Sequence, residues 1–283
     1  MAWPPSGERS GRVPGGPSDG AASGGNLGLT WSPPTVMPQD PALLESLDLC
    51  EALLFTHTPL IEMEEAVTTA IIGVGNIGSA LARNLVRGGE GVMVAARDES
   101  HAQALAKELG GLATAASVRD ASAAADVVVL AIWLDQDREL VPTIADLLDG
   151  KVVVDPSNPI GIDDGKVFRT LPEGTSAGSV VVGLLPAGAH YVKAFGTLGA
   201  ASLAAETDRA PRRAVLFYAT DDEVAAAAAE RLIGAAGFEP VKAGGVADAA
   251  RLEVPGGDLH QNGGLNGQVL DLDQARAAVA ATP

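Results

Sequence analysis

Three glycines at the spacing G-x-G-x-x-G, namely Gly73, Gly75 and Gly78, could bind phosphate groups through the backbone. The apolar run Ala70–Ile72 precedes them, and a helical pattern of apolar side chains follows and ends near Gly88. In such a strand–turn–helix unit, Gly73 allows the tight turn, Gly75 lets the backbone approach a diphosphate, and Gly78 lets the helix pack on the strand. Free N–H groups at the helix N-terminus then hold the phosphates.

The glycine spacing gains its meaning from its surroundings. With 34 glycines in 283 residues, it could arise by chance, and the alternative interpretation is a glycine-rich turn in an ordinary βα unit. A second β-rich run, Val92–Val94, follows the helix directly, so the unit has the length and punctuation of a dinucleotide-binding βαβ motif. The sequence therefore favours a dinucleotide site.

The residues after Val92–Val94 indicate which dinucleotide binds. Proteins that bind NAD(H) usually place an Asp or Glu about twenty residues after the glycines, where it accepts a hydrogen bond from the ribose 2′-hydroxyl. This chain has Ala96 and Arg97 there, and a guanidinium can pair with a 2′-phosphate. The alternative is that Arg97 is solvated and Asp98 binds the ribose. We predict NADP(H).

The ends of two later strands should line the nicotinamide, because ligands of open parallel sheets bind beyond the carboxyl ends of the strands. These ends are residues 131–134 and 155–159. Trp133 could stack on a ring, or it could pack in the core or at the rim. Asp155 could transfer a proton, but a cap of the following turn is the more common role of such a residue. The predicted cofactor-binding residues are Gly73, Gly75, Asn76, Ile77, Gly78, Ala96, Arg97, Ala131, Ile132 and Trp133.

The elements that must position these residues alternate between strand and helix from Thr68 onward. Strands are expected at 70–72, 92–94, 112–114, 127–132, 152–154, 191–195, 213–219 and 238–241, and helices at 79–87, 99–109, 117–124, 138–148, 177–185, 222–236 and 248–253. This alternation predicts an α/β fold of the Rossmann type, with a doubly wound, mainly parallel sheet in a single domain.

The ends of the chain differ from this domain in composition. Residues 1–41 contain sixteen Gly or Pro and show no periodicity, so they are expected to be disordered, and residues 42–54 could form a short helix. We expect residues 1–66 to be a disordered or weakly structured extension, residues 67–255 the oxidoreductase domain, and residues 256–283 a C-terminal loop and helical stub. Met63 lies just before the first strand, and truncation at Met63 should leave activity intact. Whether residues 1–62 belong to the native protein is left open.

Composition excludes several classes of function. A formal net charge of −17 argues against binding nucleic acid or an anionic membrane through a basic face. The single cysteine, Cys50, allows no intrachain disulfide, and the four histidines (57, 101, 190 and 260) lack the spacing of metal ligands. The sequence shows neither a signal peptide nor an apolar run long enough to span a membrane, so we expect a cytoplasmic protein. Because of the histidine spacing, we expect no bound metal. Related folds commonly form homodimers, as this chain could.

No residue pattern for acid–base or nucleophilic catalysis stands out. The sequence contains no G-x-S-x-G motif for a serine nucleophile. Tyr191 and Lys193 resemble the Tyr/Lys pair of short-chain dehydrogenases, but that pair needs a helical i, i+4 spacing. These two lie two residues apart on an expected strand, so we reject this interpretation and assign no catalytic side chain.

Several segments together carry a family resemblance. They are the glycine turn with the following Ser79–Ala82, the strand-end Arg97, and residues 126–131, 153–159, 192–197, 217–222 and 237–245. These occur in the same order as in the NADPH-dependent coenzyme F420 reductases (F420H2:NADP oxidoreductases), which the chain resembles from about Ala70 to Glu253. The N-P and K-A-F-x-T segments, at residues 158–159 and 193–197, are more specific than the glycines.

The resemblance implies hydride transfer between the nicotinamide of NADP(H) and the deazaflavin of coenzyme F420, the co-substrate, by direct ring-to-ring contact. Such a reaction needs no nucleophile. The resemblance also implies that the deazaflavin contacts Pro156, Ser157, Asn158, Pro159, Thr197 and Leu198. Archaeal members carry a histidine where Gly196 stands and a proline where Gly199 stands, and some have two basic residues at the 2′-phosphate loop. The alternatives are a reductase of another small acceptor (a cyclic imine, flavin or ferric chelate) and a non-catalytic NADP-binding regulator.

Overall fold

The computed structural model describes residues 67–281. By their contacts the residues divide into two units, Met1–Glu62 and Met63–Pro283, and everything described here belongs to the second. The disorder expected for residues 1–41, the helix expected at 42–54, Cys50 and His57 lie outside the described residues.

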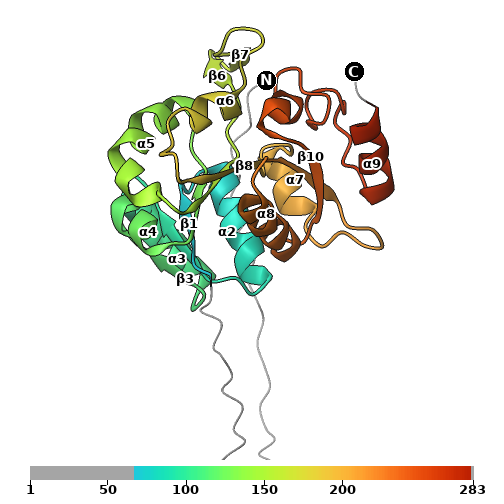
Figure 1. Cartoon of the computed structure of the whole chain (residues 1–283). Helices are drawn as coiled ribbons and strands as arrows, with labels where there is room; N and C mark the ends of the chain where they lie inside the picture. Colours follow the sequence, from blue (N-terminus) through green and yellow to red (C-terminus); the bar gives the residue numbers. More distant parts are fainter. Residues whose placement is uncertain (1–66, 282–283) are drawn as a thin grey trace, which may run out of the picture. The chain divides into compact units, whose positions relative to one another are not determined.

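An eight-stranded sheet of order β10-β9-β8-β5-β4-β1-β2-β3 forms the centre of this unit (Figure 1). Its strands are β1 Thr69–Ile72, β2 Val92–Ala95, β3 Ala113–Ala115, β4 Val127–Leu130, β5 Val152–Asp155, β8 His190–Ala194, β9 Val215–Ala219 and β10 Glu239–Gly244. Neighbouring strands are parallel, except that β8 and β9 are antiparallel. The predicted mainly parallel, Rossmann-type sheet is confirmed.

Helices cover both faces of the sheet, as the doubly wound prediction requires. They are α2 Asn76–Arg87, α3 Glu99–Leu109, α4 Val118–Ala124, α5 Leu134–Leu148, α6 Ala177–Val182, α7 Ala200–Ala205, α8 Glu223–Ala235 and α9 Leu272–Ala280, with a 3-10 helix, η1, at Val246–Leu252. Every residue of β1 is buried, because Ile71 faces the core under α2 and α8 while Ala70 and Ile72 face the core under α4 and α5. A strand that is buried on both faces appears in the sequence as a continuous apolar run, and this run made β1 predictable.

The largest difference from the sequence prediction is a second, two-stranded antiparallel sheet, which projects from the main body in Figure 1. Its strands, β6 Ile160–Asp163 and β7 Lys166–Arg169, flank Asp164 and Gly165, which have φ angles of 47° and 73°. Asp-Gly with both φ angles positive is the typical hairpin turn. The prediction missed this signal, and it missed α7 as well.

Two helical elements also differ from their expected form. Helix α5 begins at Leu134 and not at residue 138, because the side chain of Gln136 accepts a hydrogen bond from the Trp133 backbone and starts the helix one turn earlier. The element expected at 248–253 is the 3-10 helix η1. After it, Leu259, Leu270 and Ala275 are buried with the side chains of β9 and β10, so this C-terminal segment shares the core of the sheet. None of the described helices has both the length and the apolar character needed to cross a membrane.

Candidate cofactor and substrate site

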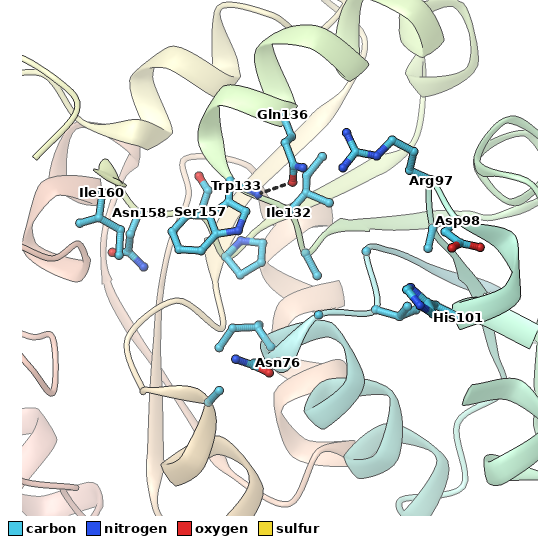
Figure 2. A pocket seen from close by; sticks show the side chains of 18 residues that line it. Asn76, Arg97, Asp98, His101, Ile132, Trp133, Gln136, Ser157, Asn158 and Ile160 are labelled. Carbon is cyan, nitrogen blue, oxygen red and sulfur yellow. Dashed lines mark hydrogen bonds between the residues drawn. The ribbon is translucent and has the colours of Figure 1, made fainter. Parts of the chain in front are cut away.

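A cleft of about 710 Å3 lies beyond the carboxyl ends of β1, β2, β4 and β5. Figure 2 shows the side chains that line it. The lining residues are Gly73, Val74, Gly75, Asn76, Ile77, Ala96, Arg97, Asp98, His101, Ala131, Ile132, Trp133, Gln136, Pro156, Ser157, Asn158, Ile160 and Ala200. The set includes every predicted cofactor-binding residue except Gly78, and it includes Pro156, Ser157 and Asn158 of the predicted substrate residues. Parallel strands bring these distant segments to one edge.

The three motif glycines differ in what their missing side chains allow. Gly73 has a φ angle of 101°, and a Cβ there would collide with the Ala131 backbone. A Cβ on Gly78 would collide with the carbonyl oxygen of Gly73, so this glycine allows α2 to pack against the turn. A Cβ on Gly75 would meet no protein atom within 4 Å and would project into open space beside the cleft. Gly73 and Gly78 therefore serve the fold, whereas Gly75 leaves room for a ligand.

The N-terminus of α2 is suited to an anion. Gly75 is its N-cap, and within residues 67–281 no side chain caps its first turn, which also contains no acidic residue. The backbone N–H groups of that turn and the positive end of the helix dipole therefore point at the cleft without a competing side chain. This geometry fits the diphosphate of a dinucleotide.

One end of the cleft carries its charged groups, Arg97, Asp98 and His101. Asp98 is the N-cap of α3, where its Oδ1 accepts hydrogen bonds from the Ser100 hydroxyl at 2.7 Å and the Ser100 backbone at 3.0 Å. These bonds lower the pKa of Asp98. Arg97 and His101 are exposed on the cleft side. One Asp98 oxygen therefore caps the N-terminus of α3, and the exposed Arg97 guanidinium can pair with a phosphate.

The opposite end of the cleft is walled by Trp133 and by the loop after β5. Trp133 is 49% exposed and lines the cleft together with Ser157 (Figure 2), so it is a rim residue and not a core residue. The Asn158 side chain ties this wall to two other segments, because its Nδ2 donates to the Gly196 carbonyl at 3.2 Å and its Oδ1 accepts from the Val254 backbone at 2.8 Å.

The remaining predicted substrate residues are buried. Pro159, Thr197 and Leu198 do not line the cleft, whose lining instead includes Ile160 and Ala200. Thr197 is 1% exposed, and its carbonyl accepts a hydrogen bond from the Gln261 backbone at 2.9 Å. Their assignment to the acceptor stays a prediction.

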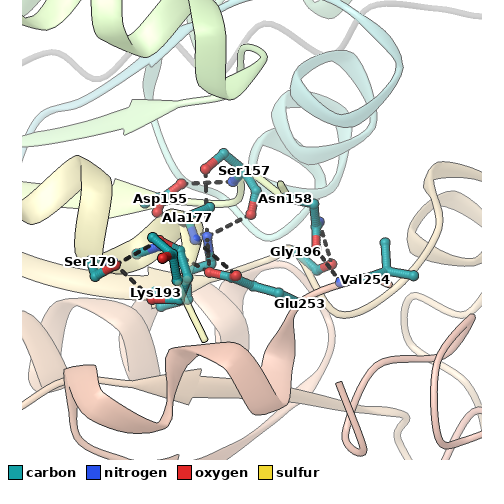
Figure 3. Close-up of polar contacts among 12 residues, drawn as sticks. Asp155, Ser157, Asn158, Ala177, Ser179, Lys193, Gly196, Glu253 and Val254 are labelled. Carbon is teal, nitrogen blue, oxygen red and sulfur yellow. Dashed lines mark hydrogen bonds and ion pairs between the residues drawn. The ribbon is translucent and has the colours of Figure 1, made fainter. Parts of the chain in front are cut away.

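A buried ionic network beneath the wall fixes its position (Figure 3). Lys193 on β8 lies 2.9 Å from Asp155 Oδ2 and 3.3 Å from Glu253 Oε1, and it donates to the Ser157 carbonyl at 2.5 Å. Asp155 Oδ1 also accepts from the Ser157 backbone at 2.7 Å. Burial lowers the pKa of Lys193, but the charges of Asp155 and Glu253 outweigh this and raise it. Asp155 therefore caps the turn and pairs with an ammonium group, which agrees with the structural role weighed for it in the sequence.

Sequence reasoning missed Lys193 and Glu253 as organising residues. A lysine inside a strand that reads as buried was the available signal, because a buried ammonium group needs an anionic partner. Tyr191 donates to the same Asp155 oxygen at 2.8 Å, so Tyr191 and Lys193 share a structural partner on one face of β8. The earlier rejection of a dehydrogenase-type Tyr/Lys pair agrees with this arrangement.

His260 was also not predicted to lie near the site. It is 3% exposed and accepts a hydrogen bond from the Asn262 backbone through Nδ1 at 3.0 Å. Burial lowers its pKa to about 4, so the ring is neutral at physiological pH. A neutral imidazole from the C-terminal segment is therefore buried close to the backbone of Gly196. Among the described residues, no group of three or more His, Cys, Asp or Glu side chains could hold a metal ion.

Comparisons with known proteins agree on the nucleotide half of the site. The family model described as NADP oxidoreductase, coenzyme F420-dependent, matches residues 68–159, which include the glycine turn and residues from both ends of the cleft. The F420-dependent NADP reductase of Methanothermobacter thermautotrophicus is 29% identical over 195 residues, which cover 64% of this chain and 82% of that protein.

Two further relatives extend the comparison. Metalloreductase STEAP3 of Rattus norvegicus is 30% identical over 191 residues, covering 68% of this chain, and the chain spans only 36% of the length of that protein. The crystal structure of a hypothetical protein from Sinorhizobium meliloti is 32% identical with a TM-score of 0.65, covering 74% of this chain and 98% of that one. With its glycine turn and its cleft, the chain is similar to NAD(P)-dependent oxidoreductases, and its residues 68–159 match the family of coenzyme F420-dependent NADP oxidoreductases.

Proposed function

We propose that the protein transfers a hydride between NADP(H) and coenzyme F420. The proposal depends on the arrangement of one cleft. The uncapped N-terminus of α2 and Arg97 lie at one end of this cleft, and Trp133 and residues 156–158 form the wall at the other end. When bound, NADPH would supply the hydride, and the deazaflavin would take it up together with one proton from solvent. The match of residues 68–159 to the family model and the similarity to an F420-dependent NADP reductase support the pairing of these two molecules.

The residues of the chain have distinct tasks in this proposal. The backbone of residues 75–77 holds the diphosphate, and Arg97 pairs with the 2′-phosphate. Ile132 and Trp133 present apolar surface to the rings and keep water from the reacting atoms. Pro156, Ser157 and Asn158 form the opposing wall, and Pro159, Thr197 and Leu198 stay predicted contacts of the acceptor.

The chemistry of the lining supports direct transfer. Within the described part of the chain, the only titratable side chains that line the cleft are those of Arg97, Asp98 and His101, all at the phosphate end. The wall end offers rings, amides and a hydroxyl. Hydride transfer between two stacked rings depends on positioning and needs no nucleophile, so this lining suits it. We further propose that the chain acts on small molecules in the cytoplasm, without nucleic acid or membrane partners, and could form a homodimer.

A second candidate is an NADPH-dependent reductase of another small acceptor, such as a ferric chelate, flavin or cyclic imine. The similarity to the rat metalloreductase favours it, as do Gly196 and Gly199 in place of the archaeal histidine and proline. A non-catalytic NADP-binding regulator is the third possibility, but the open wall end leaves room for an acceptor.

One acceptor panel separates these candidates. Purified full-length protein is mixed with NADPH and, in separate reactions, with F420, FMN, a ferric chelate or a cyclic imine, and the absorbance bands of NADPH and F420 are followed. The proposal predicts that both bands decay together with F420, at a rate well above those with the other acceptors. Oxidation of NADPH by another acceptor alone would support the second candidate. Tight NADPH binding without turnover of any acceptor would support the regulator.

A further inference from the structure

A side groove of about 630 Å3 lies between α2 and α7 and opens into the cleft. The two helices pack against each other (Figure 1). Val74, Gly75, Asn76 and Ala200 line both the side groove and the cleft. A ligand that occupies the cleft could therefore extend into the side groove without leaving the surface of the protein.

The side groove has a positive lining in an acidic chain. Within residues 67–281, Arg83 and Arg87 are the only charged residues that line it, although the chain has a formal net charge of −17. Arg87 has no acidic partner among the described residues, and its Nη1 donates to the Thr207 hydroxyl at 3.3 Å. Arg83 pairs with Glu108 through Nε and Nη2, at 2.7 and 2.9 Å. Both arginines are exposed, so an anion from solvent can reach them.

The position of these arginines along α2 separates them from the proposed diphosphate site. They lie eight and twelve residues after the N-cap Gly75, which corresponds to about 12 and 18 Å along the helix axis at about 1.5 Å per residue. Arg83 and Arg87 are four residues apart, so they are neighbours on one face of the helix. A diphosphate at the helix N-terminus cannot contact both, whereas a longer chain with several anionic groups can.

Small side chains keep the side groove open beside the arginines. Ala80 on α2 and the alanines of α7 at positions 200, 201 and 204 contribute only methyl groups to the lining. Asn84, which is 2% exposed, joins the two helices, because its Nδ2 donates to the Leu203 carbonyl at 2.8 Å. The groove is therefore a built feature of the packing of α2 on α7, with room for an extended chain.

We propose that the side groove binds an anionic side chain of the hydride acceptor, and that Arg83 and Arg87 pair with its phosphate and carboxylate groups. The inference rests on the proposed function, since Ala200 follows the predicted acceptor contacts Thr197 and Leu198 and lines both hollows. Guanidinium groups form charge-assisted hydrogen bonds with both kinds of anion. Coenzyme F420 has this chemistry, because its ribityl group carries a phosphodiester and then glutamate carboxylates. The deazaflavin riboside FO has the same ring, but its ribityl group ends in a hydroxyl.

The test compares the kcat and KM of F420 and FO at saturating NADPH, in wild-type full-length protein and in Arg83→Gln, Arg87→Gln and the double variant. Arg119→Gln is the matched control, because Arg119 is also exposed and paired with a carboxylate, that of Asp146, but does not line the side groove. All these positions are exposed, so the variants should fold, and the thermal midpoint checks this.

Wild-type protein should have a lower KM for F420 than for FO. Each groove variant should raise the KM for F420 about three- to tenfold, the loss of one exposed charge-assisted contact, and leave kcat and the KM for FO unchanged. Added salt should reduce the advantage of F420 over FO, since mobile ions screen exposed charges. Arg119→Gln should match wild type in all of these values.

Equal KM values for F420 and FO in wild type, or a KM for F420 that the groove variants leave unchanged, would overturn the inference while the proposed hydride transfer stands. A matching loss of NADPH affinity in the groove variants, measured by calorimetry, would assign the groove to the dinucleotide and would also overturn it. If neither deazaflavin is reduced, the proposed function itself fails, and the inference fails with it.

Discussion

Replacing the buried Asp137 by asparagine should stabilise the protein, and by more as the pH rises. Asp137 lies on α5 with 0% exposure, and neither carboxyl oxygen has a hydrogen-bond partner among the described residues. Burial, and next the negative charge of Asp155, raise the pKa of Asp137 to about 9, although Lys193 opposes the shift. The native state therefore keeps a proton on Asp137 that the unfolded chain releases.

The magnitude follows from linkage between proton binding and unfolding. An unfolded aspartate titrates near pH 3.9, and each unit between the folded and unfolded pKa is worth about 1.4 kcal/mol. The contribution of Asp137 to stability is fully present below about pH 4 and is lost progressively as the pH rises towards 9. The nominal loss at pH 7 is about 4 kcal/mol, which coupling to Asp155 and local relaxation should reduce to roughly 1–3 kcal/mol. Asparagine has the same shape without the titrating proton, so it should avoid this loss.

Urea unfolding of the full chain at about pH 5, 7 and 8.5 measures the effect through the extrapolated free energy of unfolding. The difference between Asp137→Asn and wild type should widen by about 2 kcal/mol or more across this range. Asp135→Asn is the matched control, because the Asp135 side chain is 70% exposed on the same helix and its removal should leave the pH slope unchanged. A constant or shrinking difference would show that Asp137 is ionised and paired in the folded protein, contrary to the reasoning above.

Four further substitutions test the cleft and the ionic network beneath its wall. Arg97→Ala should raise the NADPH dissociation constant about tenfold or more, the loss of one charge-assisted pair, while NADH binding changes little; equal effects on both dinucleotides in calorimetry would refute the 2′-phosphate contact. Gly75→Val should abolish dinucleotide binding but keep the thermal midpoint, since its side chain enters open space, whereas Gly78→Val should lower the midpoint sharply; measurable NADPH affinity in Gly75→Val would contradict the placement of the diphosphate. Lys193→Met should lower the free energy of unfolding in urea by about 3–5 kcal/mol, because it leaves the buried carboxylates of Asp155 and Glu253 without their cation; a neutral result would mean that the network does not stabilise the wall.

The nucleotide half of the fold could be predicted because its determinants are local. The β1–α2–β2 unit is encoded within thirty or so residues by an apolar run, three glycines and a helical pattern, which together favour one motif. The boundaries of α3 and β5 follow from equally local signals, namely the Asp98 cap and a run of valines. The loop between β2 and α3 places Arg97, so the charged end of the cleft was accessible from the sequence.

The acceptor half could not be predicted because long-range contacts build it. Glu253 reaches Lys193 and the N-terminus of α6, and the Val254 backbone reaches Asn158, across intervals of sixty to a hundred residues that periodicity does not encode. His101 reads as one polar position of an amphipathic helix, and only the fold shows that it lines the cleft. The β6–β7 hairpin did have a local signal, Asp164-Gly165, and was missed because the strands are short and lie outside the main alternation.

The transfer of an isotopic label tests the central claim most directly. NADPH carrying deuterium at both C4 positions is mixed anaerobically with one equivalent of F420 and the full-length protein, and the reduced deazaflavin is analysed by mass spectrometry. Direct hydride transfer predicts one deuterium in each reduced deazaflavin, with loss of NADPH matching loss of F420. Reduction of F420 without the label, or oxidation of NADPH that leaves F420 untouched, would contradict the account.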